Sequence, residues 1–87
     1  MQVKMLVMQN REGLSSQNAM SLVKTASSFK SRIHLEKESK KIDAKSVMGV
    51  ISLGIKYSES VIVIINGDDE KSAMEEIEKL FENNFAV

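Results

Sequence analysis

Serines stand at two places where a helix is expected to begin, Ser15–Ser16 and Ser46. A serine at a helix N-cap accepts a backbone hydrogen bond that stabilises the helix by about 1 kcal/mol. The same position suits a phosphoserine, because its phosphate meets free backbone N–H groups and the positive end of the helix dipole. Two interpretations of Ser46 therefore stay open: a helix cap alone, or a phosphorylation site with Lys45 beside it and Val47, Met48 and Ile51 following.

The sequence contains few of the residue types that usually form an enzyme active site. There is one histidine, His34, and no cysteine. Because His34 alternates with Ile33 and Leu35, we expect its ring to point to solvent from a strand. No spacing of His, Cys, Asp or Glu predicts a metal site, and no glycine-rich phosphate loop is present. The sequence predicts a protein that is not an enzyme and uses neither metal nor cofactor.

Length and composition predict one small domain, residues 1–87. The absence of cysteine fits a reducing cytoplasm, and no stretch is long enough to span a bilayer. Twelve basic and twelve acidic residues cancel, which argues against direct binding to nucleic acid or to an anionic membrane.

The charges are unevenly distributed along the chain. Residues 1–56 carry a net charge of +6 and residues 57–87 a net charge of −6. A solvated acidic helix at the C-terminus is one explanation. A basic face that docks an acidic partner is the other.

Hydrophobic periodicity predicts the elements that must position the serines. Residues 3–8 and 60–66 are apolar and β-prone, which predicts strands, and residues 32–44 alternate in a way that predicts a hairpin with its turn at Glu38 and Ser39. Apolar residues at intervals of three and four predict a helix from Ser15 or Ser16 toward Phe29 and another after residues 68–70. The apolar stripe of that last helix is Ala73, Met74, Ile77, Leu80 and Phe81.

Residues 44–55, AKSVMGVISLGI, are ambiguous. Their β-branched residues favour a strand, whereas Ser46 and Gly54 at the two ends favour a short helix. The resulting order β-α-β-β-(α?)-β-α indicates an α+β fold with helices on one face of a sheet. RNA-recognition domains have a similar order but stack bases on aromatic residues of their strands, and no predicted strand here carries an aromatic residue.

Several stretches together resemble the HPr phosphocarrier family of the phosphoenolpyruvate-dependent sugar phosphotransferase system. They are residues 44–55, Gly13 with Leu14, Ala19, KTAS at residues 24–27 and NGDDE at residues 66–70. The resemblance runs nearly end to end. It implies an open-faced β-sandwich of βαββαβα order, with a four-stranded antiparallel sheet and three helices on one face. It also implies that residues 46–52 are helical.

In low-GC Gram-positive members of the family, an ATP-dependent HPr kinase/phosphorylase modifies the serine matched by Ser46. The seryl-phosphorylated form acts as corepressor of a catabolite-control transcription factor, and a histidine-less paralogue, Crh, works only through this route. The resemblance therefore implies a Crh-like regulatory phosphoprotein of carbon catabolite regulation. Its apolar docking patch would consist of Met20, Val47, Met48 and Ile51, although ordinary packing is the alternative for these residues.

The phosphocarrier loop departs from the family pattern. The family's phosphorylatable histidine falls on Ser15, and its arginine and proline fall on Gln17 and Asn18. A serine hydroxyl gives a stable ester and needs a base, whereas imidazole titrates near neutrality and forms a phosphoramidate of high transfer potential. The missing arginine also removes a bidentate contact to phosphoserine and repressor. Phosphohistidine transfer is not expected, and an atypical carrier using Ser15 or Ser16 stays as an alternative.

The family register predicts an apolar surface on the sheet face away from the helices. Its members are Val3, Met5, Val7, Ile62 and Ile64. Monomers seldom leave such a surface bare over more than a few hundred Å². We expect homodimerisation or partner docking there, with a merely apolar surface as the alternative. If this face were the whole function, Ser46→Ala would be silent.

Overall fold

The three helices and four strands follow one another in the predicted order. The structure, a computed structural model, describes residues 1–85, so the predicted domain end at residue 87 lies outside the described part. The elements are β1 Gln2–Val7, α1 Ser16–Ser27, β2 Arg32–Lys37, β3 Lys40–Asp43, α2 Val47–Leu53, β4 Ser60–Asn66 and α3 Glu70–Glu82. The ambiguous segment is a helix, α2, as the resemblance implied.

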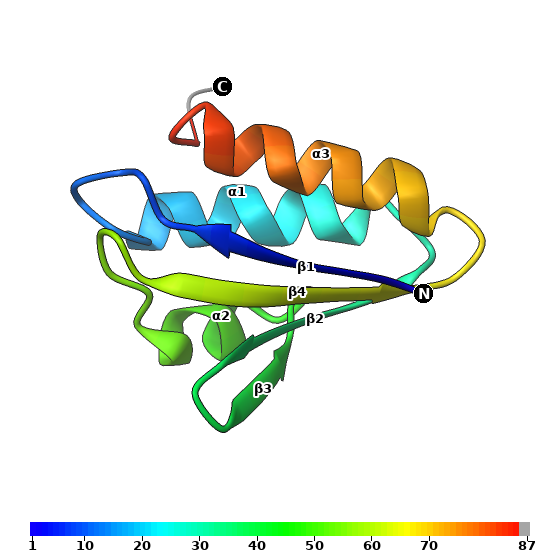
Figure 1. Cartoon of the computed structure of the whole chain (residues 1–87), viewed down its shortest axis with the longest axis horizontal. Helices are drawn as coiled ribbons and strands as arrows, with labels where there is room; N and C mark the ends of the chain where they lie inside the picture. The colour runs from blue at the N-terminus through cyan, green and yellow to red at the C-terminus, as the bar shows by residue number, and fades with distance from the viewer. Residues whose placement is uncertain (86–87) are drawn as a thin grey trace.

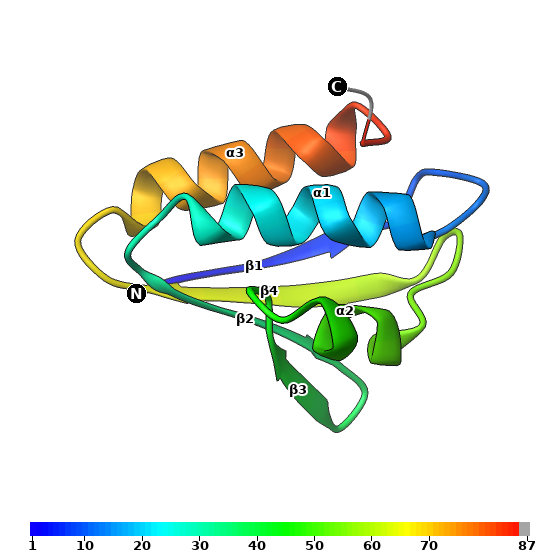
Figure 2. The ribbon, with the colours of Figure 1, turned by 180° about the vertical axis from the view of Figure 1, so that it is seen from behind.

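One antiparallel sheet carries all four strands in the order β1-β4-β2-β3. The sheet passes in front of α1 and α2 in Figure 1, and from behind, in Figure 2, these helices lie in front of it. The helices therefore form a single layer on one face, and the other face is open. This arrangement confirms the predicted α+β open-faced sandwich.

The core lies between that helical layer and the sheet. Strands β2 and β4 alternate buried and more exposed side chains, and the helices bury one stripe each. The buried residues of the three helices are Ala19, Leu22 and Ala26, then Val50 and Leu53, then Ala73, Met74, Ile77 and Phe81. Each fully buried Leu or Ile contributes about 1.5–3 kcal/mol of transfer free energy, which makes this interface the main source of stability.

Strand β1 begins and ends one residue earlier than predicted. Met8, the last residue of the predicted strand, lies just beyond it and is fully buried. Lys4 pairs with Val63, a residue buried on the helix side. Its ammonium lies 2.7 Å from the carboxylate of Glu78 in α3. Lys4 therefore lies on the helix side at the sheet edge, and its apolar neighbours Val3 and Met5 point outward.

The acidic residue at the start of α3 does not cap this helix with its side chain. Asp69 is the N-cap residue, but its side chain makes no capping bond to the helix. It accepts hydrogen bonds from the backbone amides of Lys30 and Ser31 instead, at 2.8 and 2.9 Å, and from the Ser31 hydroxyl. The Ser31 hydroxyl and the Lys30 amide hold the pKa of Asp69 below its usual value.

Candidate functional site

Ser46 is held at the start of α2 by a tight turn. Its amide donates to the carbonyl of Asp43 at 3.0 Å, and a carboxylate oxygen of Asp43 accepts from the Lys45 amide at 2.8 Å. Ser46 has extended backbone angles, φ −107° and ψ 116°, and its Oγ accepts from the amide of Gly49 at 3.1 Å. The residue is exposed. The predicted N-cap is therefore present, with its hydroxyl at the surface.

Two amides of the first turn of α2 lie next to this hydroxyl. Within residues 1–85, neither the Val47 nor the Met48 amide donates to a protein acceptor. Unsatisfied N–H groups at a helix start carry the positive end of the helix dipole. An anionic group attached to Ser46 would therefore meet hydrogen-bond donors and a favourable field without unwinding the helix.

The ammonium of Lys45 does not lie with this group. It donates to the carbonyl of Phe29 at 2.8 Å, just past the C-terminus of α1. A cation at that end of a helix interacts favourably with the carbonyls and with the dipole. Lys45 thus has a structural role in this structure, and its predicted contact with a phosphate would require the side chain to leave Phe29.

The predicted docking patch is exposed on α1 and α2, which pack against each other. The exposed fractions are 61% for Met20, 36% for Val47, 77% for Met48 and 42% for Ile51. The inward face of α2 is supplied by Val50 and Leu53, which are buried. The patch residues are therefore not needed for the core, and their exposure is compatible with docking.

The predicted carrier loop is built as a second helix cap. Ser15 Oγ accepts from the amide of Asn18 at 3.2 Å, and Asn18 Nδ2 donates to the carbonyl of Gly13 at 3.4 Å. Ser15 is half-buried, whereas Ser16 and Gln17 are exposed. Neither bond brings an acid or a base to the Ser15 hydroxyl.

The loop before this cap is fixed to the segment that follows α2. Gly13 is buried with φ +68°, and a Cβ there would come within 2.8 Å of the Ile55 carbonyl oxygen. The next amide, that of Leu14, donates to the same carbonyl at 2.9 Å. Only glycine tolerates both the left-handed φ and this close approach.

His34 lies on the opposite face of the sheet from α1. It pairs with Ile64 and Asp43, and it alternates with the buried Ile33 and Leu35. His34 is half-buried on the open face. It cannot serve Ser15, because the sheet separates the two positions.

The open sheet face carries the predicted apolar residues. Val3 is 56% exposed, Met5 65% and Val7 44%. Val3 pairs with Ile64 and Met5 with Ile62, and both isoleucines are half-buried. These residues therefore lie on the sheet face away from the helices, and a docking role there stays a prediction.

Two lysines of the β2–β3 hairpin hold the far end of α2, a role that sequence analysis missed. Lys37 Nζ donates to the carbonyls of Leu53 and Gly54 at 3.3 and 3.1 Å and forms an ion pair of 2.8 Å with Glu59. Lys40 Nζ donates to the Ser52 carbonyl at 3.2 Å. The Lys37 hydrogen bond and the Lys56 amide keep the pKa of Glu59 below its usual value.

These contacts bear on the predicted basic face. Lys4, Lys37, Lys40 and Lys45 all have protein partners. Cations that cap helices or pair with carboxylates are less available to an acidic partner. Because Lys4 and Lys37 pair with carboxylates of residues 57–87, the positive field of this half of the chain is weaker than its net charge of +6 suggests.

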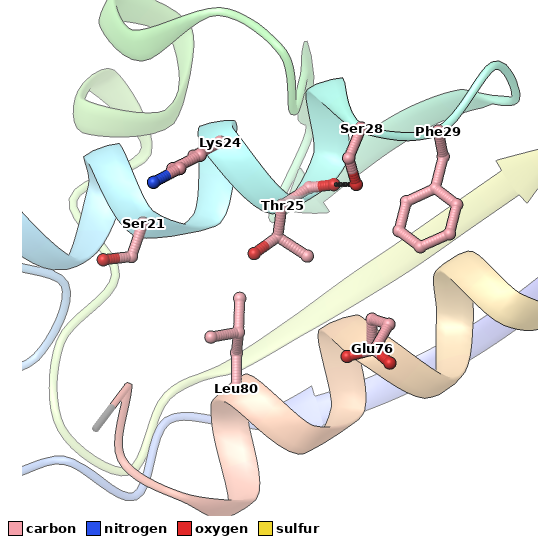
Figure 3. Close-up of a pocket in the computed structure, with 7 residues that line it drawn as sticks. All are labelled: Ser21, Lys24, Thr25, Ser28, Phe29, Glu76 and Leu80. Carbon is pink, nitrogen blue, oxygen red and sulfur yellow. Dashed lines mark hydrogen bonds between the residues drawn. The ribbon is translucent and has the colours of Figure 1, made fainter. Parts of the chain in front are cut away.

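A groove of about 580 Å³ lies between α1 and α3. Its walls include Lys24, Thr25 and Phe29 from the α1 side and Glu76 and Leu80 from α3, and Figure 3 shows Leu80 pointing across toward α1. None of the predicted site residues lines it. Residues 1–85 contain no group of three His, Cys, Asp or Glu side chains able to hold a metal ion. No helix in this part of the chain is long and apolar enough to cross a membrane.

A four-stranded antiparallel sheet backed by one layer of three helices, with a serine capping α1 and another capping α2, defines a small open-faced α+β sandwich domain. The family model for the phosphorylation site of the PTS HPr component matches residues 3–83. The phosphocarrier protein HPr of Xylella fastidiosa (strain 9a5c) is 38% identical over 80 residues, which cover 92% of this chain and 90% of that protein. The HPr-like protein Crh of Bacillus subtilis (strain 168) is 39% identical over 67 residues, which cover 77% of this chain and 79% of that protein. The chain belongs to the HPr family.

Solved structures agree with this assignment. HPr-C-His from Thermoanaerobacter tengcongensis superposes with a TM-score of 0.94 at 39% identity, covering 98% of this chain and 96% of that chain. An HPr dimer from the same organism superposes with a TM-score of 0.80 at 40% identity. The match covers 92% of this chain and 92% of that chain. Crh from Bacillus subtilis, described as an intertwined dimer with a swapping domain, superposes with a TM-score of 0.74 at 34% identity. The match covers 88% of this chain and 87% of that chain. HPr and Crh are phosphocarrier or regulatory proteins, so the prediction that the chain is not an enzyme is confirmed.

Proposed function

We propose that the chain is a cytoplasmic regulatory phosphoprotein of the Crh type, modified on Ser46 by an HPr kinase/phosphorylase. The observation that carries the proposal is that Ser46 is exposed and lies next to the Val47 and Met48 amides, which donate to no protein acceptor within residues 1–85. In the transfer, Ser46 Oγ forms a bond to the γ-phosphorus of ATP, the bond to ADP breaks, and the hydroxyl proton leaves to a base of the kinase.

Phosphorylation would change the charge of this surface more than its shape. The group adds about −1.5 to −2 charges at neutral pH. Its oxygens replace Ser46 Oγ as acceptors for the first-turn amides, so the short helix keeps its cap. The exposed Met48 and Ile51 then lie beside a near-dianion, and a partner can recognise the apolar and anionic parts together.

The proposed reader is a catabolite-control transcription factor, and Gln17 bears on its affinity. Gln17 is exposed in the first turn of α1. Its amide cannot make the bidentate charge-assisted contact of an arginine. The partner must therefore supply the cations that recognise the phosphate. Gln17→Arg is expected to strengthen binding of the phosphorylated form, whereas Gln17→Ala should change it little.

The test is incubation with ATP and the host's HPr kinase, followed by intact mass and peptide fragmentation. Ser15→Ala is a matched control for Ser46→Ala, because both serines cap a helix through similar bonds of 3.2 and 3.1 Å. We expect one phosphoryl group on the wild type and on Ser15→Ala, and none on Ser46→Ala. An unmodified wild type would leave Ser46 as a helix cap only and would refute the proposal.

The carrier alternative uses Ser15 or Ser16 instead. Ser15 is half-buried and its Oγ accepts a hydrogen bond from the Asn18 amide, and neither feature activates the hydroxyl as a nucleophile. This function requires transfer from phosphorylated enzyme I of the phosphotransferase system. Detection of that transfer, and its loss in Ser15→Ala or Ser16→Ala, would replace the regulatory proposal.

A second candidate function does not involve Ser46 and rests on the open sheet face. Its exposed apolar strand residues lie on the side of the sheet away from α2. The dimeric forms described for an HPr and a Crh relative favour protein association in this family. In this case Ser46→Ala would bind the partner as the wild type does, and Met5→Glu would not.

A further inference from the structure

The open sheet face is divided into an apolar half and a charged half. Strands β1 and β4 supply the apolar half, with Val3 beside Ile64 and Met5 beside Ile62. We call these four residues together with Val7 the open-face patch. Strand β1 is the edge of the sheet, so the open-face patch reaches the edge on one side.

The charged half, on β2 and β3, has a formal net charge of zero. Glu36 lies opposite Lys41, Asp43 lies opposite His34, and Arg32 follows on the same face. Two formal positive and two formal negative charges are therefore present. This balance removes the electrostatic attraction that an anionic membrane or a nucleic acid would need.

We propose that the open-face patch binds the same patch on a second copy of this chain. An isologous interface requires a surface that complements itself, and an uncharged, apolar pair of strands meets that condition. Two copies do not repel each other, because the chain has a formal net charge of zero at pH 7. This inference goes beyond the proposed function and does not depend on modification of Ser46.

The position of the patch at the sheet edge sets the geometry of the pair. Two open faces pack about 10 Å apart, with β1 of each copy over β4 of the other, as sheets do in sandwiches. Met5 of one copy then meets Ile62 of its partner, and the reverse contact follows from the two-fold axis. The charged half of each copy projects past the other's edge and stays in water.

The expected dimer is weak and leaves Ser46 accessible. Two strands of this length cover an area of about 20 by 10 Å, well below the roughly 800 Å² per partner of a standard interface. Association therefore needs concentrations on the order of 0.1–1 mM. Ser46 belongs to the helical layer, so both copies of it stay accessible on opposite outer sides of the dimer.

Sedimentation equilibrium of the unmodified full chain, between about 10 μM and about 1 mM, tests the inference. We expect the weight-average mass of the wild type to rise from that of the monomer toward twice that value. Met5→Glu and Val3→Glu should stay monomeric throughout. Tyr57→Glu is the matched control, because Tyr57 is 53% exposed and Val3 56%, and only Val3 belongs to the patch; it should associate as the wild type does.

Several results would overturn the inference. A wild type that stays monomeric at the highest concentration excludes a self-interface, and sedimentation of that monomer with phosphatidylcholine vesicles would assign the face to lipid instead. Dimerisation of Met5→Glu and Val3→Glu at the wild-type level would place the contact elsewhere or indicate an exchanged strand. Loss of the dimer in Tyr57→Glu would place the contact at the loop between α2 and β4. Circular dichroism checks that each variant is folded, as expected for exposed positions.

Discussion

Asp69, at the start of α3, accepts a hydrogen bond of 2.9 Å from the backbone amide of Ser31, 38 residues earlier in the chain. Its other oxygen accepts from the amide of Lys30 at 2.8 Å. Gly67 lies against the same loop, where a Cβ would come within 2.6 Å of the Ser31 backbone. One carboxylate therefore joins the α1–β2 and β4–α3 loops, and Ser31 is buried beneath it.

Asp69→Asn is expected to lower the thermal unfolding midpoint clearly more than Asp68→Asn, its exposed neighbour. In the wild-type protein each carboxylate oxygen of Asp69 accepts from a different backbone N–H group. The asparagine side chain has only one acceptor oxygen, and its nitrogen is a donor, so it cannot satisfy both N–H groups in this way. The folded-state pKa of Asp69 lies below the usual 3.8, so its contribution is complete above pH 3.8 and is lost as pH falls through the lowered pKa. Thermal unfolding of both variants from neutral pH downward measures this. A difference between wild type and Asp69→Asn that grew on acidification would contradict the prediction.

Gly13→Ala is expected to cost about 1–3 kcal/mol of unfolding free energy. The new Cβ would meet the Ile55 carbonyl oxygen at 2.8 Å at a φ of +68°. Gly54→Ala separates the two causes, since Gly54 has φ +59° with no atom within 4 Å of the added carbon. It should cost only about 1 kcal/mol from the backbone conformation. Equal losses in urea denaturation would show that the contact with Ile55 carries no energy.

Ser46→Ala is expected to cost about 1 kcal/mol, because it removes the acceptor for the Gly49 amide. Ser46→Asp keeps an oxygen at the N-cap and should restore most of the loss. Ser15→Ala should cost a similar amount at α1. Chemical denaturation of the three variants therefore separates the cap from any regulatory role. A wild-type stability for Ser46→Ala would mean that the cap contributes nothing.

Lys37→Met is expected to cost about 1–3 kcal/mol. The Lys37 ammonium is bound to two carbonyls at the end of α2 and to Glu59, and its side chain is 14% exposed. Lys41→Met is the control, because Lys41 is an exposed residue on the open face of the same hairpin. Hydrogen exchange should quicken in the last turn of α2 in Lys37→Met only. Unchanged exchange there would show that the lysine does not hold the helix end.

Local patterns were sufficient for most elements. Periodicity predicted β2, β3, β4, α1 and α3, and the serines at helix starts were correctly identified as caps. Residues 44–55 could not be assigned from their own pattern, because a short apolar run suits a buried strand as well as a helix. The family resemblance implied the helix, and packing of Val50 and Leu53 against the core keeps it there.

Side-chain partners were less predictable, because they depend on residues that are distant in the sequence. Lys45 is next to Ser46 in the sequence, which suggested a contact with a phosphate, but its ammonium donates to the Phe29 carbonyl. Asp69 precedes α3 as a capping residue would, but its carboxylate accepts from the Ser31 amide. A long or charged side chain can bind any suitable partner within its reach, and only the folded chain determines which partners lie within that reach.

The sequence by itself determined which residues face the core and which serines begin helices, because those choices depend on alternation, on 3.6-residue periodicity and on the local chemistry of a cap. The tertiary structure decided which charges remain available and what Ser15 and Ser46 have around them. It placed His34 across the sheet from Ser15, assigned lysines to helix ends, and gathered Val3, Met5, Val7, Ile62 and Ile64 on one open face. Such contacts join positions far apart in the chain, and the physical reason is that strand pairing and helix packing, not sequence proximity, bring them together.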